Sequence, residues 1–303
     1  MSPASPARPP STSLLAQGRA DTYAILARFD RQKARLLRVA PDFYDLPYQE
    51  LCVQTADGVA LSAWFVPAPA GAARAATMVL LHHHYGGQKA ALLPWIELFH
   101  RHGLACLAFD ARAHAGSPCR PDQDSYQQRF HDVQAMHAEL MRRGARRVVA
   151  YAQSQGAAVV AGGLAHVPEL RAVIFDSGPA ALGVPSIGFL AHNLVPREQP
   201  HRALVTALVT VELVRRTRPG RYAARLWPAL ARLRDRPLLW LHGSADTVIP
   251  RAWAEPWFRL LGPGAAGWRA VMLPGARHAQ CLQHAPADVE RAVGELLAQL
   301  DGP

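Results

Sequence analysis

Lysine is almost missing from this sequence, although the chain is strongly basic. Lysine occurs only as Lys33 and Lys89, so arginine supplies almost all of the positive charge behind a formal net charge of +10. A basic balance can indicate nucleic acid or an anionic membrane as a partner. No nucleic-acid motif accompanies the charge here. We therefore interpret it as an arginine-rich, solvated surface and expect no nucleic-acid partner.

Cysteine and long apolar runs are scarce as well. The four cysteines have neither metal-ligand nor redox spacing, and they are Cys52, Cys106, Cys119 and Cys281. No signal-peptide core is evident in residues 1–13, and no run is long and apolar enough to span a bilayer with confidence. We expect a cytoplasmic protein that binds neither a metal nor a cofactor.

Strand and helix signals alternate along most of the 303 residues, half of which are hydrophobic. Expected strands lie at 50–55, 59–66, 77–81, 104–109, 148–152, 171–175, 237–241 and 268–273. Expected helices lie at 88–102, 125–143, 155–165, 253–260 and 286–300. After an initial hairpin, this alternation predicts an α/β fold, with a mostly parallel eight-stranded sheet covered by helices on both faces.

The domain organisation follows from where the alternation is interrupted. We expect a disordered tail at 1–18, an amphipathic helix within 19–47, a core formed by 48–180 and 237–303, and an inserted helical lid at 181–236. The first helix is expected to pack on the main domain. Contact of its basic face with a membrane surface is the alternative, which the composition does not favour.

One short segment points to chemistry. The apolar strand 148–152 is followed by Ser154 and then by a run typical of a helix. A nucleophile on a strained strand-to-helix turn needs small residues two positions before and after it, and Ala152 and Gly156 occupy those positions. The start of the helix also offers free N–H groups to a developing oxyanion. The same pattern would also fit a serine that caps an ordinary helix.

The other residues that a hydrolytic serine requires follow it in the chain. Asp246 and His278 each stand in a loop just after an expected strand. Since the carboxyl ends of parallel strands share one edge of a sheet, Ser154, Asp246 and His278 should meet there. Their order along the chain is serine, acid, histidine.

Four motifs together carry a resemblance that covers about residues 48–300. They are His-Gly-x-x-Asp-x-x-x-Pro at 242–250, Gly-x-x-His at 275–278, Asp-x-Arg-x-x-x-Gly-Ser at 110–117, and the histidine- and glycine-rich stretch 81–87. The sequence resembles α/β-hydrolases of the esterase, thioesterase and aminopeptidase-like branches. Alanines 113 and 115, and His84, stand where that family usually has glycine.

The resemblance implies a role for each site residue. Ser154 would be the nucleophile, His278 the general base and acid, and Asp246 the residue that orients His278. The backbone N–H groups of Tyr85 and Gln155 would form the oxyanion hole. Asp176 is a rival orienting acid, because some members of the superfamily place it after the corresponding strand. The family fold is the same mostly parallel sheet with a helical lid.

The expected reaction is cleavage of a carboxylic ester or thioester through an acyl-enzyme on Ser154. The lid is apolar, so we expect a small hydrophobic acyl substrate, contacted by His84, Phe189 and Leu190. An acyltransferase, an amidase or aminopeptidase, a cofactor-free haloperoxidase or carbon–carbon hydrolase, and a non-catalytic binding scaffold remain alternatives. Three adjacent histidines at 82–84 point to alternating sides and do not predict a metal site.

Overall fold

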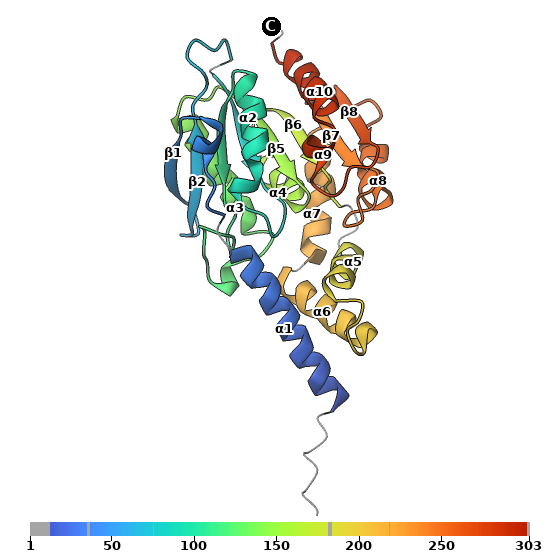
Figure 1. Cartoon of the computed structure of the whole chain (residues 1–303). Helices are drawn as coiled ribbons and strands as arrows, with labels where there is room; N and C mark the ends of the chain where they lie inside the picture. Colours follow the sequence, from blue (N-terminus) through green and yellow to red (C-terminus); the bar gives the residue numbers. More distant parts are fainter. Residues whose placement is uncertain (1–12, 35–36, 75, 181–183, 218, 302–303) are drawn as a thin grey trace, which may run out of the picture.

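A computed structural model gives the arrangement of the chain and describes residues 13–34, 37–74, 76–180, 184–217 and 219–301. One sheet runs through the centre of the molecule (Figure 1). Its eight strands are β1 (Gln49–Gln54), β2 (Ala60–Val66), β3 (Thr77–His82), β4 (Ala105–Phe109), β5 (Arg147–Gln153), β6 (Leu170–Asp176), β7 (Leu238–Gly243) and β8 (Trp268–Leu273). Each lies within two residues of its expected position.

The strand order in the sheet is β1-β2-β4-β3-β5-β6-β7-β8. The pairs β1–β2 and β2–β4 are antiparallel, and every pair from β4 onwards is parallel. The prediction of a mostly parallel eight-stranded sheet is therefore confirmed. Because β3, β5, β6, β7 and β8 run in the same direction, the loops that follow them converge on one edge of the sheet.

Helices cover both faces of the sheet. The helical segments are α1 (Leu14–Ala34), η1 (Pro41–Tyr44), η2 (Lys89–Leu92), α2 (Leu93–Arg101), η3 (Pro121–Gln123), α3 (Arg129–Arg142), α4 (Gln155–Leu164), α5 (Val184–Leu194), α6 (Arg202–Thr217), α7 (Pro219–Ala231), α8 (Arg251–Leu261), α9 (Cys281–His284) and α10 (Pro286–Ala298). One hydrophobic core lies between the sheet and α3, α4, α7 and α8. A second core lies between the opposite face and α2, α9 and α10.

The strands of the parallel part are apolar on both sides because both cores use them. In β5, for example, Val148 and Ala150 point into the first core, while Val149 and Tyr151 point into the second. Every fully buried Val, Leu or Phe side chain in these cores contributes about 1.5–3 kcal/mol to folding. Such a strand reads in sequence as a continuous apolar run, which is why the strand positions were predictable.

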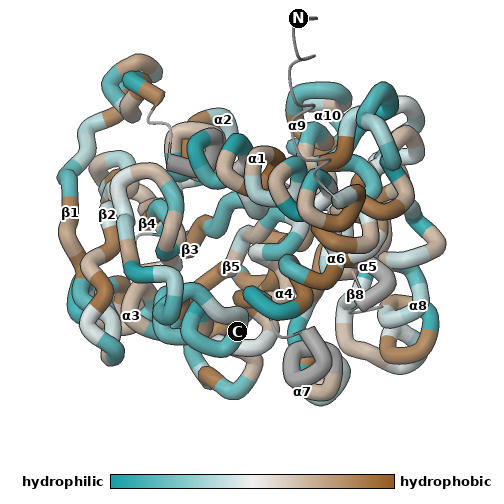
Figure 2. Tube along the Cα trace, turned by 90° about the horizontal axis from the view of Figure 1, so that it is seen from below, coloured by the Kyte–Doolittle hydropathy of each residue, from teal (hydrophilic) through white to brown (hydrophobic). Residues whose placement is uncertain are grey.

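The first helix and the lid differ from the expectation. Helix α1 begins at Leu14, inside the stretch assigned to a disordered tail, and residues 1–12 of that stretch lie outside the described residues. Its Leu26 packs with α5 and α6 in a third hydrophobic cluster. Both views place α1 beside α6 (Figures 1 and 2). The predicted packing of this helix on the main domain is therefore corrected to packing on α5 and α6.

The predicted lid, 181–236, divides into two parts. Helices α5 and α6 form the third cluster with α1, through Ile187 and Val205 among others. Helix α7 instead packs against α4 on the sheet, with Leu226 and Leu230 buried in the first core. Residues 181–183 and 218 lie outside the described residues. Within the described part of the chain, no helix is long and apolar enough to cross a membrane.

Candidate active site

Ser154 occupies a strained turn between β5 and α4. Its φ of 52° and ψ of −118° are unusual for a residue other than glycine. Its backbone N–H donates to the carbonyl of Asp176 (2.8 Å). A Cβ atom at Gly156 would lie 2.8 Å from the carbonyl oxygen of His83, and one at Gly178 would lie 2.4 Å from that of Ser154. The crowded backbone explains why small residues surround the serine.

Three side chains predicted from the sequence form one hydrogen-bonded chain. The Nε2 atom of His278 lies 2.9 Å from the Oγ atom of Ser154, and its Nδ1 atom lies 2.8 Å from Oδ2 of Asp246. Asp246 is fully buried as a side chain, whereas His278 keeps 14% of its side-chain surface exposed. When Nδ1 carries the proton and donates a hydrogen bond to the carboxylate, Nε2 is unprotonated and can accept the proton of the serine hydroxyl.

The loop after β7 fixes the carboxylate of Asp246. Its Oδ1 atom accepts hydrogen bonds from the backbone N–H groups of Val248 (2.9 Å) and Ile249 (2.8 Å). One oxygen is thus used by the loop, and the other faces His278. Three charge-assisted hydrogen bonds leave the carboxylate little freedom to turn, which keeps the imidazole in one orientation.

Asp176 lies close to this chain but binds other groups. Its buried carboxyl group accepts hydrogen bonds from Tyr151 Oη (3.1 Å) and Ser177 Oγ (2.9 Å). Burial raises the pKa of Asp176 above its ordinary value, although hydrogen bonds from Cys281, Ser177 and Tyr151 act against the rise. The Ser177 hydroxyl in turn accepts the N–H of Ala279 (2.9 Å), next to His278. Sequence analysis missed this link, because a serine after a strand carries no distinctive signal.

The loop after β3, which contains Tyr85, passes the first turn of α4, where a Cβ atom at Gly156 would lie 2.8 Å from the carbonyl oxygen of His83. Gln155 is the first residue of that helix. Two histidines tie this loop to residues 110–117. The N–H of Ala111 donates to Nε2 of His83, and the N–H of Gly86 donates to Nε2 of His114, both at 3.0 Å. An imidazole nitrogen that accepts a hydrogen bond is unprotonated, so both rings are neutral in this arrangement.

Burial keeps the histidines of the 82–84 stretch uncharged. It lowers the pKa of His82 and of His83 to about 3. The His84 ring lies near Oε1 of Gln153 (3.3 Å), and burial lowers its pKa as well. His84 has a φ outside the left-handed region, so the absence of the usual glycine adds no strain there. Among the described residues, no group of three or more His, Cys, Asp or Glu is arranged to hold a metal ion.

Comparison with known proteins identifies the fold. No family model matches the sequence. Two uncharacterised proteins from strains of Mycobacterium tuberculosis are each 25% identical over 236 residues, which cover 76% of this chain and 72% of theirs. Among solved structures, an esterase from Pyrococcus furiosus superposes with a TM-score of 0.71 at 20% identity, covering 88% of this chain and 96% of that chain.

An α/β hydrolase from Novosphingobium aromaticivorans superposes with a TM-score of 0.57 at 17% identity, over 83% of this chain and 98% of that chain. This chain has the α/β-hydrolase fold. The predicted resemblance and fold class are thereby confirmed, and the three hydrogen-bonded residues stand at the loop positions that the resemblance assigned to them.

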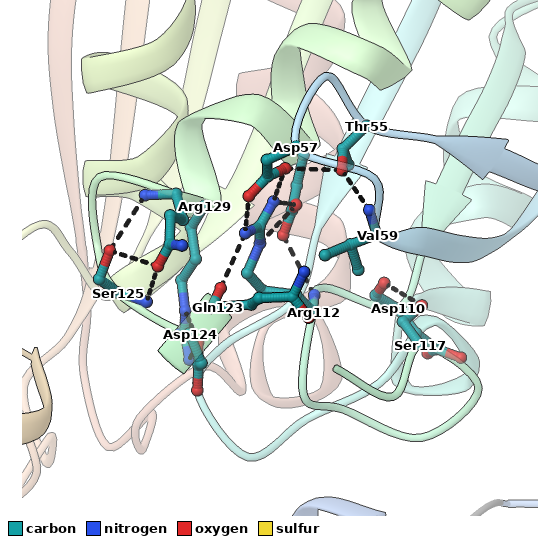
Figure 3. Close-up of polar contacts among 12 residues, drawn as sticks. Thr55, Asp57, Val59, Asp110, Arg112, Ser117, Gln123, Asp124, Ser125 and Arg129 are labelled. Atoms are coloured by element: carbon teal, nitrogen blue, oxygen red, sulfur yellow. Dashed lines mark hydrogen bonds and ion pairs between the residues drawn. The ribbon is translucent and has the colours of Figure 1, made fainter. Parts of the chain in front are cut away.

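Two alanines carry the strain that α/β-hydrolases usually relieve with glycine in the loop after β4. Ala113 has a φ of 61° and Ala115 a φ of 38°. Ion pairs hold the loop nevertheless (Figure 3). Buried Arg112 binds Asp57 (2.6 Å) and Asp132 (2.7 Å), and Asp110 pairs with Lys89 (2.7 Å). These contacts over-determine the loop, so it keeps a conformation that alanine disfavours.

The two lid residues predicted to touch substrate have different surroundings. The Phe189 ring on α5 lies 4.9 Å from the ring of Trp253 on α8, the helix that follows the Asp246 loop. Leu190 packs against the cluster shared by α1, α5 and α6. Both side chains are half-buried. Phe189 therefore connects α5 to α8, while substrate contact by either residue stays a prediction.

Proposed function

We propose that this α/β-hydrolase-fold protein is a serine hydrolase that cleaves a carboxylic ester or thioester. The observation that carries the proposal is the continuous hydrogen-bonded chain from Ser154 through His278 to Asp246. Such a chain turns a weakly nucleophilic hydroxyl into one that can attack a carbonyl carbon. The structural similarity to an esterase supports the reaction class.

In the proposed first half-reaction, the Oγ atom of Ser154 bonds to the carbonyl carbon while its proton passes to Nε2 of His278. The backbone N–H groups of Tyr85 and Gln155 stabilise the negative oxygen of the tetrahedral intermediate. When the intermediate collapses, the bond to the alcohol or thiol breaks. His278 then gives its proton to that leaving group, and an acyl ester of Ser154 remains.

In the second half-reaction, water attacks the acyl carbon and its proton passes to His278. Collapse of the second intermediate releases the carboxylic acid, and the proton returns to Ser154, so the site is restored. Asp246 stabilises the imidazolium form of His278 in both halves and does not need to take up a proton. No metal or cofactor takes part in this sequence.

We expect the substrate to carry a hydrophobic acyl group. The ring of Phe189 and the side chain of Leu190 are half-buried on a lid helix that contacts α8. Apolar surface of this kind favours an alkyl or acyl chain over a charged group. His84, whose neutral ring contacts Gln153 beside the serine, would add a polar contact to the substrate.

The proposal is tested by hydrolysis of p-nitrophenyl esters with acyl chains from two to twelve carbons, together with a matching series of thioesters. We expect turnover by the wild type, with a maximum at an intermediate or long chain, and loss of at least about a thousandfold in Ser154→Ala. The control is Ser13→Ala, at an exposed position next to the start of α1, and it should keep wild-type turnover. Absence of turnover on every ester and thioester, by folded wild-type protein, would contradict the proposal and favour a binding scaffold.

A further inference from the structure

Arg129 is a buried cation at the start of α3 that the proposed reaction does not use. Only 3% of the residue is exposed. Its guanidinium binds the Asp124 carboxylate through Nε (2.7 Å) and Nη2 (2.6 Å). Figure 3 draws Arg129 and Asp124 together with Arg112 and its partner Asp57. Its remaining terminal nitrogen, Nη1, donates to Oε1 of Gln155 at 2.5 Å.

The same guanidinium also lies over an aromatic ring. Its Cζ atom is 5.0 Å from the ring centroid of Tyr85. A guanidinium is planar, so it can stack on a ring with its face while its edge donates several hydrogen bonds. Arg129 therefore contacts the side chains of Tyr85 and Gln155 at once. These two residues belong to different segments, the loop after β3 and the first turn of α4.

Tyr85 and Gln155 are the two residues whose backbone N–H groups form the proposed oxyanion hole. Such a site works only when both donors aim at the point where negative charge develops. The two donors sit on separate segments, and a shift of either segment by a fraction of an ångström would weaken the site. Arg129 links the two segments, because it contacts the side chain of each residue.

The charge on Arg129 is stable at this position. Burial acts to lower the pKa of Arg129, but the Asp124 carboxylate and the hydroxyls of Tyr85 and Tyr126 together outweigh it, and the pKa rises above its ordinary value. The guanidinium thus remains charged throughout the pH range in which the protein is folded. Its charge also adds to the effect of burial in lowering the pKa of His82 and His83. The positive charge of Arg129 therefore acts electrostatically on the segment that leads to Tyr85.

An ion pair with a purely structural role would not require the contacts of Arg129 with Gln155 and Tyr85. Asp124 alone is enough to neutralise Arg129, and a lysine could supply that charge. The bond to Gln155 and the stacking on Tyr85 require the planar, multidentate group that only arginine has. We propose that Arg129 is a positioning residue that holds the two halves of the oxyanion hole at a fixed separation. This inference rests on the proposed serine hydrolase function.

The test compares Arg129→Met, Arg129→Lys and the control Arg142→Met, using an ester that the wild type hydrolyses. Arg142 lies on the same helix, and its side chain is 70% exposed. The readouts are kcat, KM, thermal stability, and the inhibition constant of a trifluoromethyl ketone. The ketone adds the serine hydroxyl to its carbonyl and forms a tetrahedral oxyanion, so its affinity reports on the oxyanion hole rather than on substrate binding.

For Arg129→Met we expect kcat to fall by about tenfold to a hundredfold, with KM within about threefold, and the ketone to bind more weakly by a factor similar to the fall in kcat. Arg129→Lys should recover only part of the loss, and Arg142→Met should match the wild type. If Arg129 had only a structural role, its loss would lower thermal stability without selectively weakening the binding of the ketone. Wild-type kcat and ketone affinity in a folded Arg129→Met protein would overturn the inference.

A second variant keeps the test decisive if Arg129→Met does not fold. Gln155→Met retains the Arg129–Asp124 pair and removes the bond between Arg129 and Gln155, together with the hydrogen bond between Gln155 and Tyr126. We expect it to show the same selective loss, whereas Tyr126→Phe, which loses the second bond but keeps the first, should retain wild-type kcat and ketone affinity. Wild-type values of kcat and ketone affinity in both Gln155→Met and Arg129→Lys would refute positioning by Arg129. A wild type that neither hydrolyses any ester nor binds the ketone would instead overturn the proposed function itself, and the inference with it.

Discussion

The carboxylate of Asp246 lies 2.8 Å from Nδ1 of His278, while the carboxyl group of Asp176 is bound by Tyr151 and Ser177. Asp176 ends β6, Asp246 stands three residues after the neighbouring strand β7, and both are buried. The two acids differ in their hydrogen-bond partners. Only the Asp246 carboxylate is hydrogen-bonded directly to the imidazole that faces Ser154, so the two acids should respond differently to substitution.

We predict that Asp246→Asn lowers kcat on the order of 10³- to 10⁴-fold, because an amide favours the wrong tautomer of His278 and does not stabilise its cation. Tyr151 and Ser177 bond to different oxygens of Asp176. Asp176→Asn should keep kcat within about tenfold, since the amide oxygen can accept from one hydroxyl while the amide NH2 donates to the other. Steady-state kinetics of the two variants decides between the acids. The reverse ranking would assign the orienting role to Asp176.

A second prediction concerns the crowding around Ser154. In Gly178→Ala, the new Cβ atom would lie 2.4 Å from the carbonyl oxygen of Ser154 and 2.9 Å from its Cα atom. The turn must shift, so we expect a loss of about 1–3 kcal/mol in unfolding free energy and a large fall in kcat. Chemical denaturation and ester hydrolysis measure the two effects.

Gly294→Ala in α10 is the matched control for that substitution. Its Cβ atom would meet only the His102 ring, at 3.6 Å. Alanine is favoured over glycine inside a helix by about 0.5–1 kcal/mol, so this variant should be slightly more stable and fully active. Equal behaviour of the two variants would show that the close approach at Gly178 does not constrain the serine turn.

A third prediction uses the strained alanines of the loop after β4. Ala113→Gly and Ala115→Gly should each raise the unfolding free energy by about 0.5–1 kcal/mol, because glycine tolerates the positive φ of these positions. Ala111→Gly, at a buried position without a positive φ, should lower it. The measurement is urea denaturation at constant pH. Destabilisation by all three substitutions would argue that the loop stores no strain.

A fourth prediction follows from the buried histidines. Burial lowers the pKa of His82 and of His83 from 6.5 to about 3 in the folded protein. The unfolded chain therefore binds protons at a higher pH than the folded one. Above about pH 6.5 both states leave these histidines neutral, and they cost the folded protein no stability. As the pH falls toward 3, the unfolding free energy declines by about 1.4 kcal/mol per pH unit for one such histidine.

Thermal melting of the wild type between pH 7.5 and 4.5 tests that decline. His82→Asn removes one titrating group while an amide N–H can still donate to the carbonyl of His83, so its melting temperature should fall less steeply with acid. His192→Asn, at an exposed position on α5, should follow the wild-type slope. A slope that is the same in all three proteins would contradict the linkage to His82.

The parallel part of the sheet and the site residues could be predicted because each has a local sequence signal. Buried strands read as short apolar runs, and Ser154, Asp246 and His278 each stand just beyond one. Whether those three side chains would meet was a matter of topology, and the order of strands at the edge of the sheet brings them together.

Other features depend on tertiary contacts that the sequence does not display. The partner of α1 was mispredicted because an amphipathic helix shows that one face is buried, but not against what. Likewise, α7 resembles the lid helices in composition and yet packs on the sheet. The contact of Arg129 with both Tyr85 and Gln155 joins three separate segments, and only the folded chain shows it.

The most direct test of the account is covalent labelling of the purified protein with a fluorophosphonate, followed by peptide mapping of the adduct by mass spectrometry. The account predicts a single adduct on Ser154 and no labelling in Ser154→Ala or His278→Ala, although both variants remain folded. A folded wild type that stays unlabelled, or an adduct on a residue other than Ser154, would contradict the claim that Ser154 is an activated nucleophile.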